Sequence, residues 1–237
     1  MHTFFLKNIP PAGTETELEK REQDHLFKTL RCRRGDQLKL CDGAGSIAIA
    51  EATESRRVKI ISVQKFERST VEVHLFAALP KNAKLDSLLK PVTEAGVASI
   101  TPLKCRYSVA EKNEIPERWF TLLEEACKQS GNPFLPDIHP TLNVADAIEY
   151  CRENDYLIFY GSQHGSILQV QDLPADRPLR IAWMVGPEGG FDENETALLD
   201  AAGKGITLGR YIFRLENAAL AGVAYLDTIA RAAGSRP

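Results

Sequence analysis

The sequence lacks any apolar run long enough to span a membrane, and its first residues lack the long apolar region of a signal peptide. Its five cysteines form no Cys-x-x-Cys pair and no spaced set with histidine, so we expect free, reduced thiols and no metal site. Low-complexity segments and internal repeats are missing as well. These absences argue against membrane-embedded, secreted and zinc-binding classes and favour a globular cytoplasmic protein.

The composition is that of an ordinary globular protein, with 43% hydrophobic and 26% charged residues among 237. This length allows one large domain or two modest ones. The net charge of -3 is unevenly distributed, because residues 1–70 carry +3 and residues 71–237 carry -6. A basic N-terminal part permits RNA binding there, although ordinary surface variation explains a difference of this size equally well.

Residues 1–70 have the pattern of a small β-barrel domain. Apolar and polar residues alternate on both sides of Asp42-Gly43, a dipeptide typical of hairpin turns. A short helix is expected at residues 24–30, and another strand at residues 58–63. Several short strands separated by turns indicate a barrel rather than a layered α/β domain.

From residue 71 onward, strand-like apolar runs alternate with segments of helical spacing, which predicts an α/β domain with a parallel sheet over residues 71–237. Short, continuous apolar runs that are typical of buried parallel strands lie at residues 71–80, 155–161 and 179–186. Helical spacing of apolar residues occurs in 85–97, 117–131, 192–203 and 216–234. Pro91 falls inside the first of these helices and is expected to kink or shorten it.

Three turns that follow apolar strands are candidates for a ligand site: YGSQHG (160–165), GPEGGF (186–191) and TLGRYIFRLENA (207–218). Ligands of open parallel sheets bind beyond the carboxyl ends of the strands. We therefore expect the three turns to line one pocket.

The GPEGGF turn offers backbone N–H donors at Gly189, Gly190 and Phe191, and it leads into a helix. Asp192 is expected to cap that helix, with Glu195 completing a capping box. The turn matches neither the G-x-G-x-x-G dinucleotide fingerprint nor a phosphate loop. A purely structural turn is the alternative, and for an isolated Gly-Pro turn it would be the better one.

The third turn holds Arg210, Arg214 and Glu216 within seven residues. A guanidinium at this place would hold an RNA phosphate or stabilise a developing anion. A surface arginine beside a glutamate that caps the last helix explains the spacing equally well.

Four segments in order resemble the RsmE family, the SPOUT-class methyltransferases that modify N3 of a uridine in 16S small-subunit ribosomal RNA. GPEGGF with LGRYIFRLENAAL, HLFKTLRCRRGDQLKLCDGAG, LLKPVTEAGVASITPL and RWFTLLEEACKQSGNPFLPDI carry the resemblance across nearly the whole chain. It implies a PUA-like, RNA-binding β-barrel at 1–70 and a trefoil-knotted α/β methyltransferase domain at 71–237. It also implies S-adenosyl-L-methionine as cofactor, homodimers, and the small ribosomal subunit as partner.

The resemblance also implies roles for individual residues. Arg214 would be the active-site arginine, with Glu216 as a helper. The cofactor would be held by Gly161, Gly186, Pro187, Glu188, Gly189, Gly190, Leu208, Gly209, Tyr211, Ile212 and Phe213. Ribosomal RNA would be bound by Lys7, Arg31, Arg33, Arg34, Gln129 and Asn132.

The chain departs from the family pattern at positions expected to face RNA. Thr3 and Asn132 stand where the family has arginines, and Leu215 and Asn217 stand where it has threonines. Lys7 is a candidate to supply the charge missing at Thr3. Two alternatives to an active methyltransferase therefore stay open: an RNA-binding paralogue without catalysis, and a nucleotide-binding protein without a role on RNA.

Overall fold

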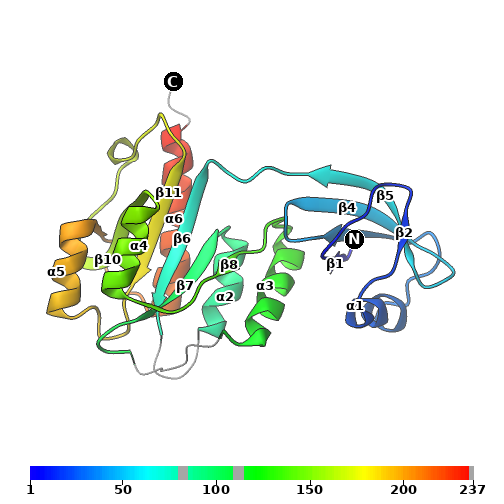
Figure 1. Cartoon of the computed structure of the whole chain (residues 1–237), viewed down its shortest axis with the longest axis horizontal. Coiled ribbons are helices and arrows are strands. Elements are labelled where there is room, and N and C mark those ends of the chain that lie inside the picture. Colours follow the sequence, from blue (N-terminus) through cyan, green and yellow to red (C-terminus); the bar gives the residue numbers. More distant parts are fainter. Residues whose placement is uncertain (80–84, 109–114, 235–237) are drawn as a thin grey trace. The chain divides into compact units, whose positions relative to one another are not determined.

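The computed structural model describes residues 1–79, 85–108 and 115–234, and the chain divides into two compact units (Figure 1). The first unit comprises residues 1–68 and 123–135, and the second comprises residues 69–122 and 136–237. The sequence predicts a single boundary after residue 70. The structure differs because the segment 123–135 belongs with the N-terminal strands, to which its backbone is hydrogen-bonded.

The first unit is built on a five-stranded sheet with the strand order β1-β3-β4-β5-β2. Its elements are β1 (Thr3–Phe5), β2 (Glu15–Thr16), α1 (Lys20–Asp24), the π-helical turn η1 (His25–Thr29), β3 (Gln37–Cys41), β4 (Ser46–Ala52) and β5 (Val58–Lys65). β1 and β3 are parallel and the other pairs are antiparallel. The predicted hairpin and strands are present, whereas the PUA-like barrel stays a prediction.

The core of this unit shows why these strands form. Phe4, Leu38, Leu40 and Ile60 alternate with exposed or half-buried residues and are fully buried or nearly so. Burying one face of each strand against the same cluster is the main stabilising contribution expected for a half-exposed sheet. The helical segment begins earlier than predicted, at Lys20, and changes to π-helix before it ends.

The second unit is built on a parallel sheet with the order β12-β10-β11-β6-β7-β8, and β9 also pairs with β7. Its strands are β6 (Val71–Ala78), β7 (Ser99–Lys104), β8 (Asp137–Ile138), β9 (Leu142–Asn143), β10 (Tyr156–Ser166), β11 (Leu179–Val185) and β12 (Lys204–Ile206). The central strands β6 and β11 are almost continuously buried, as their apolar runs predict.

Helices pack on both faces of this sheet (Figure 1). They are α2 (Asp86–Glu94), α3 (Glu117–Ser130), α4 (Val144–Glu153), the 3-10 turn η2 (Val170–Asp172), α5 (Glu193–Ala202) and α6 (Leu215–Gly234), and α3 crosses from the second unit into the first. α6 packs on β6 and β11 and against α2, whereas α4 packs on β10 and against α5. The α/β class is therefore as expected, and the trefoil knot stays a prediction.

Pro91 does not end its helix, since α2 continues to Glu94. The helix ends three residues after Pro91, before the end of the predicted range 85–97, and the expected kink stays a prediction. In this last turn the Thr93 hydroxyl donates to the Leu89 carbonyl at 2.7 Å, and Ala95 N donates to the Pro91 carbonyl at 3.0 Å.

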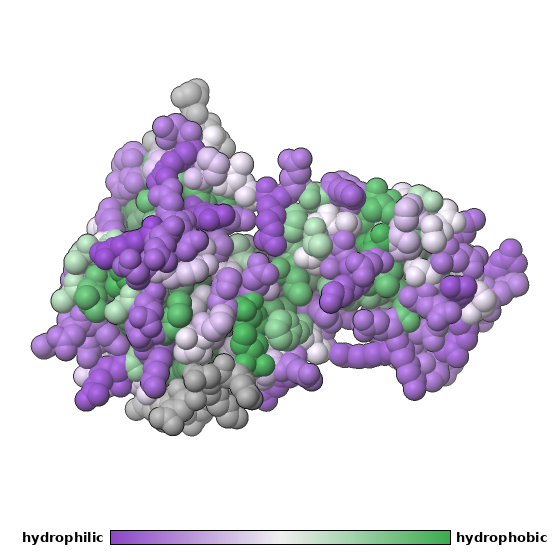
Figure 2. Space-filling model, in the orientation of Figure 1, coloured by the Kyte–Doolittle hydropathy of each residue, from purple (hydrophilic) through white to green (hydrophobic). Residues whose placement is uncertain are grey.

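Hydrophilic side chains cover most of the face shown in Figure 2, with smaller hydrophobic areas between them. Within the described ranges, no helix combines the length and the apolar character needed to cross a membrane.

Candidate active site

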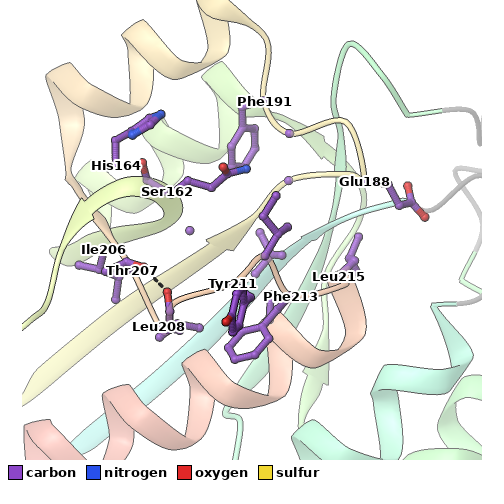
Figure 3. A pocket seen from close by; sticks show the side chains of 18 of the residues that line it. Ser162, His164, Glu188, Phe191, Ile206, Thr207, Leu208, Tyr211, Phe213 and Leu215 are labelled. Carbon is purple, nitrogen blue, oxygen red and sulfur yellow. Dashed lines mark hydrogen bonds between the residues drawn. The ribbon is translucent and has the colours of Figure 1, made fainter.

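A cavity of about 390 Å³ lies in the second unit, at the carboxyl-terminal part of β10 and beyond the carboxyl ends of β11 and β12 (Figure 3). It is lined by the segments 161–164, 185–191 and 206–213. The turn predicted at 160–165 is wrong, because these residues continue β10, whose pairing with β12 shifts register between Gly161 and Ser166. Figure 3 shows Ser162, His164 and Phe191 on one side and Leu208, Tyr211 and Phe213 on the other. The edge of a parallel sheet has thus brought together three segments that lie far apart in the chain.

Trp183 on β11 contributes a fully buried apolar wall to the cavity. Its indole Nε1 donates to the Ala218 carbonyl of α6 at 3.1 Å, so its one polar atom is satisfied. A Cβ atom at Gly161 would lie 3.5 Å from the indole ring. Since the ring is held on one side and faces Gly161 on another, this wall of the cavity is preformed.

The GPEGGF turn is rigidly attached to its surroundings. Gly190 N donates to the Pro187 carbonyl at 2.8 Å, and Gly190 has a φ of +77°, a backbone conformation that favours glycine. Glu195 N donates to Asp192 Oδ1 at 2.7 Å, and Asp192 N donates to Glu195 Oε2 at 2.9 Å. The predicted capping box is therefore confirmed.

Glu195 has a second task that the sequence does not reveal. Its other oxygen, Oε1, accepts a hydrogen bond from Arg106 N at 2.7 Å, just beyond the end of β7. The next residue, Tyr107, lies against the turn, because a Cβ at Gly189 would be 3.6 Å from its ring. One carboxylate therefore ties the glycine-rich turn both to its own helix and to the loop after β7.

The turn from Leu208 to Phe213 leaves its backbone available to a ligand. Among the described residues, these six make no hydrogen bond with another backbone group. The one hydrogen bond they accept comes from Thr207 Oγ1 to the Gly209 carbonyl, at 3.1 Å (Figure 3). A ligand with polar edges would find both donors and acceptors here.

The same turn exposes three consecutive large apolar side chains. Tyr211 is 84% exposed, Ile212 is 73% exposed and Phe213 is 41% exposed. Contiguous exposed apolar residues at the rim of a cavity are typical of surfaces that bind a partner or a ligand.

All eleven residues predicted to bind a cofactor line this cavity. The two predicted catalytic residues, Arg214 and Glu216, do not line it, although Leu215 between them does. Arg214 is exposed and stands directly before α6, where its carbonyl accepts from Ala218 N at 2.8 Å. Arg210, which the sequence also singles out, does line the cavity.

Three lining residues fall outside the segments 160–165, 186–191 and 207–218: Trp183, Val185 and Ile206. Val185 and Ile206 directly precede two of these segments, so extending each by one position would include them. Trp183 differs, because a tryptophan in an apolar strand is indistinguishable from core in the sequence.

The predicted RNA-binding residues lie in the first unit, at two ends of its sheet. Arg33 and Arg34 precede β3 and lie beside the turn after β4, because Gly35 N donates to the Ala52 carbonyl at 2.9 Å. Arg34 is paired with Glu54 at 2.7 Å, and both side chains are exposed. Arg31 lies in the same stretch and has a φ of +55°.

Lys7, Gln129 and Asn132 belong to the opposite end. Lys7 follows Leu6, whose N–H donates to the carbonyl of Cys41, the last residue of β3. Asn132 Oδ1 accepts from Phe134 N at 3.0 Å, and Phe134 forms a bridge with Ala44 between β3 and β4. At about 3.3 Å per residue, the length of β4 separates the two groups by about 20 Å.

Comparisons with known proteins agree with this geometry. Residues 67–227, more than half of the chain, match the family model described as an RNA methyltransferase domain. The chain is 30% identical to ribosomal RNA small subunit methyltransferase E of Rickettsia conorii, with 93% of each covered. It is 26% identical to the protein of that name from Synechocystis, covering 86% of this chain and 70% of the relative.

A crystal structure of ribosomal RNA small subunit methyltransferase E from Neisseria gonorrhoeae bound to S-adenosyl methionine is also similar. It aligns with a TM-score of 0.83 and 27% identity, over 97% of this chain and 98% of that one. The chain belongs to the ribosomal RNA small subunit methyltransferase E family. Within it, the matched segment 67–227 contains every residue that lines the cavity.

Proposed function

We propose that this chain transfers the methyl group of S-adenosyl-L-methionine to N3 of a uridine in 16S small-subunit ribosomal RNA. The observation that carries the proposal is the cavity formed by three glycine-containing segments at the carboxyl edge of the parallel sheet. Relatives named for small-subunit ribosomal RNA methylation, and the Neisseria structure bound to the cofactor, support it.

The residues present fit this cofactor. The cavity volume of about 390 Å³ is in the range of small-molecule sites. Leu208 offers apolar surface to an adenine ring, and the backbone from Leu208 to Phe213 offers donors and acceptors to its polar edge. Gly189 and Gly190 present backbone without side chains, which allows close approach of a ligand.

When bound, the cofactor supplies a methyl group on a positively charged sulfur, which is the electrophile. The chain must then orient the uridine and favour the anionic form of its N3, because neutral N3 carries a proton and is a poor nucleophile. Arg214 is our candidate for this task, since an exposed guanidinium beside the cavity would orient the base or its phosphate. Glu216, at the first turn of α6, would assist it.

We further propose that the chain acts as a homodimer with a trefoil-knotted methyltransferase domain. The exposed apolar side chains of Tyr211, Ile212 and Phe213 at the rim support a partner subunit, because burial of such residues favours association. In a twofold pairing each subunit would contribute residues to the other's cavity. Since ribosomal RNA is a cytoplasmic substrate, the reaction would occur in the cytoplasm.

The test is methyl transfer from labelled S-adenosyl-L-methionine to small ribosomal subunits that lack their own uridine modification. The product base is identified by mass spectrometry. Label recovered as N3-methyluridine would support the proposal in full. Cofactor binding without any transfer to RNA would contradict it and would leave the chain as an RNA-binding relative without catalysis.

A further inference from the structure

One end of the sheet in the first unit is assembled from three separate segments. They are the turn 42–45, the end of β5 with residues 66–68, and residues 133–135, which we call together the hairpin-tip end. Gly45 N donates to the Pro133 carbonyl at 2.9 Å, and Leu135 N donates to the Gly43 carbonyl at 2.8 Å. Phe66 N donates to the Gly45 carbonyl at 2.8 Å. These backbone bonds fix the three segments relative to one another.

Arg68 is held at this end by an aromatic ring. Its guanidinium carbon lies 5.1 Å from the centroid of the Phe134 ring, within the range of a cation–π contact. The ring itself cannot move toward the sheet, because a Cβ at Gly45 would already be 2.7 Å from Phe134 Cε1. Phe134 therefore limits the positions that the guanidinium can take.

Arg68 is exposed and carries an uncompensated charge. Among the described residues, no carboxylate lies within 4.0 Å of Arg68, and its side chain makes no hydrogen bond with any of them. Four other arginines of this unit are ion-paired, among them Arg21 with Glu125 at 2.9 Å and Arg34 with Glu54 at 2.7 Å. Arg31 and Arg33, at the opposite end of the sheet, also lack an ion pair with the described residues. The protein has thus positioned this guanidinium without neutralising it.

The neighbouring charges leave the hairpin-tip end basic. Lys65, paired with Ser46 in the strand register, and Lys7 are both exposed. Of the two acidic residues here, Asp42 directs Oδ1 to the backbone, where it accepts from Ala44 N and Ser46 N at 2.8 Å each. Glu67 is the other, and it is exposed.

Asn132 contributes to this arrangement through the backbone. Its Oδ1 accepts from Phe134 N at 3.0 Å and so shapes the turn that presents the ring to Arg68. The Asn132 amide carries no charge, whereas the Arg68 guanidinium over the Phe134 ring does.

We propose that Arg68, oriented by Phe134, is a contact for an RNA phosphate at the hairpin-tip end. The inference rests on the proposed function, because it assumes that ribosomal RNA is the substrate. A guanidinium suits this task, since its planar fork of donors matches two phosphate oxygens. Phe134 is then a positioning residue and Arg68 the residue that touches RNA.

The experiment measures binding of the full-length protein to unmodified small ribosomal subunits at several salt concentrations. Arg68→Ala should weaken binding by about three- to tenfold and lower the salt slope by about 0.7 to 0.9, which corresponds to one lost phosphate contact. Arg68→Lys should keep the slope but lose part of the affinity, because an ammonium lacks the fork. Arg21→Ala, which removes the same charge from an ion-paired site of the same unit, should behave as wild type.

The positioning role of Phe134 is tested by measuring kcat and KM of methyl transfer for Phe134 variants. Phe134→Leu should raise KM for the RNA substrate with kcat unchanged, and Phe134→Tyr should restore KM because the ring is retained. A loss of stability alone would lower the active fraction, and therefore kcat, for Phe134→Leu. A lowered kcat with an unchanged KM would thus contradict the positioning role.

The outcomes separate this inference from the proposed function. Wild-type protein that methylates the subunits, together with an Arg68→Ala variant of equal affinity and equal salt slope, would overturn the inference and leave the proposed function intact. Wild-type protein that neither binds nor methylates the subunits would overturn both.

Discussion

Trp183 and Gly222 are in direct contact, with the indole lying against the backbone of α6. A Cβ atom at residue 222 would fall 2.1 Å from Trp183 Cε2, a distance that no real contact allows. Four residues earlier, the Ala218 carbonyl accepts the indole N–H at 3.1 Å. The helix therefore fixes the position of the aromatic wall of the cavity by both packing and hydrogen bonding.

We expect Gly222→Ala to destabilise the protein by about 1–3 kcal/mol, because the added methyl group must displace the indole or the helix. Displacement of Trp183 should also weaken cofactor binding. Gly234→Ala at the end of the same helix is the matched control, since nothing lies within 4 Å of a Cβ there. Urea denaturation and calorimetric titration measure both effects, and equal stability of the two variants would refute the prediction.

Gly190→Ala should weaken cofactor affinity severalfold. The residue has a φ of +77° and open space around its Cβ position, so the cost is backbone strain, about 1–2 kcal/mol, rather than a clash. Gly13→Ala introduces similar strain in the first unit, at a φ of +89° with nothing nearby. Titration of both variants with S-adenosyl-L-methionine should show reduced affinity for Gly190→Ala only. A wild-type affinity of Gly190→Ala would contradict the prediction, because the turn would then bind the cofactor without needing this backbone conformation.

Replacing Glu195 by Gln should loosen the glycine-rich turn. Glu195 accepts from Asp192 N and from Arg106 N, one with each oxygen, and an amide can accept on only one side. We expect a loss of about 1–2 kcal/mol in stability and a weaker affinity for the cofactor. Glu193→Gln, in the first turn of the same helix, provides the control, and an identical melting temperature for both variants would count against this role.

Arg214→Ala should lower methyl transfer by about 100-fold while leaving cofactor affinity unchanged. The reason is that Arg214 does not line the cavity but stands beside it, where it would act on the RNA base. Single-turnover transfer to small subunits is the measurement. Arg231→Ala, at an ion-paired arginine on α6, should keep wild-type turnover. An Arg214→Ala variant with an undiminished rate would exclude the assignment.

The cysteines should differ sharply in reactivity. Burial raises the pKa of the Cys41, Cys105, Cys127 and Cys151 thiols to about 12, so almost no thiolate is present at pH 8. Cys32 is half-buried, and its pKa is raised less. Iodoacetamide at pH 8, followed by mass spectrometry, should label Cys32 first, and Cys32→Ser should remove the fast phase. Equal rates at two or more thiols would contradict these pKa shifts.

The candidate cofactor site was predictable because its signals are local. Strands of a parallel sheet end at a common edge, so the segments at the carboxyl ends of β10, β11 and β12 must meet, although the first of them continues as strand rather than as the predicted turn. The capping box of Asp192 and Glu195 is equally local, since both partners lie within four residues. Neither inference needed knowledge of distant contacts.

Features that depend on long-range pairing were not predictable in the same way. The bonds from Gly43 and Gly45 to residues 133–135 join segments about 90 residues apart, and no periodicity in either segment indicates them. The hydrogen bond from Arg106 N to Glu195 and the place of Trp183 in the cavity wall also depend on contacts between distant segments, so they could not be predicted either. The helix α4 is a different case, because its cap, formed by Asn143 with Asp146 N, joins residues only three positions apart.

The assignment of residues 123–135 to the first unit has a consequence for the modularity of this protein. Because that unit is encoded by two stretches of the chain, no single cut in the gene separates it from the rest. A fragment that begins at residue 69 would retain Phe134 and Leu135 without the strands that cover them, and a fragment that ends at residue 68 would lose the segment that closes its hairpin. The two units are therefore expected to be inherited, exchanged and expressed together, as one indivisible genetic block.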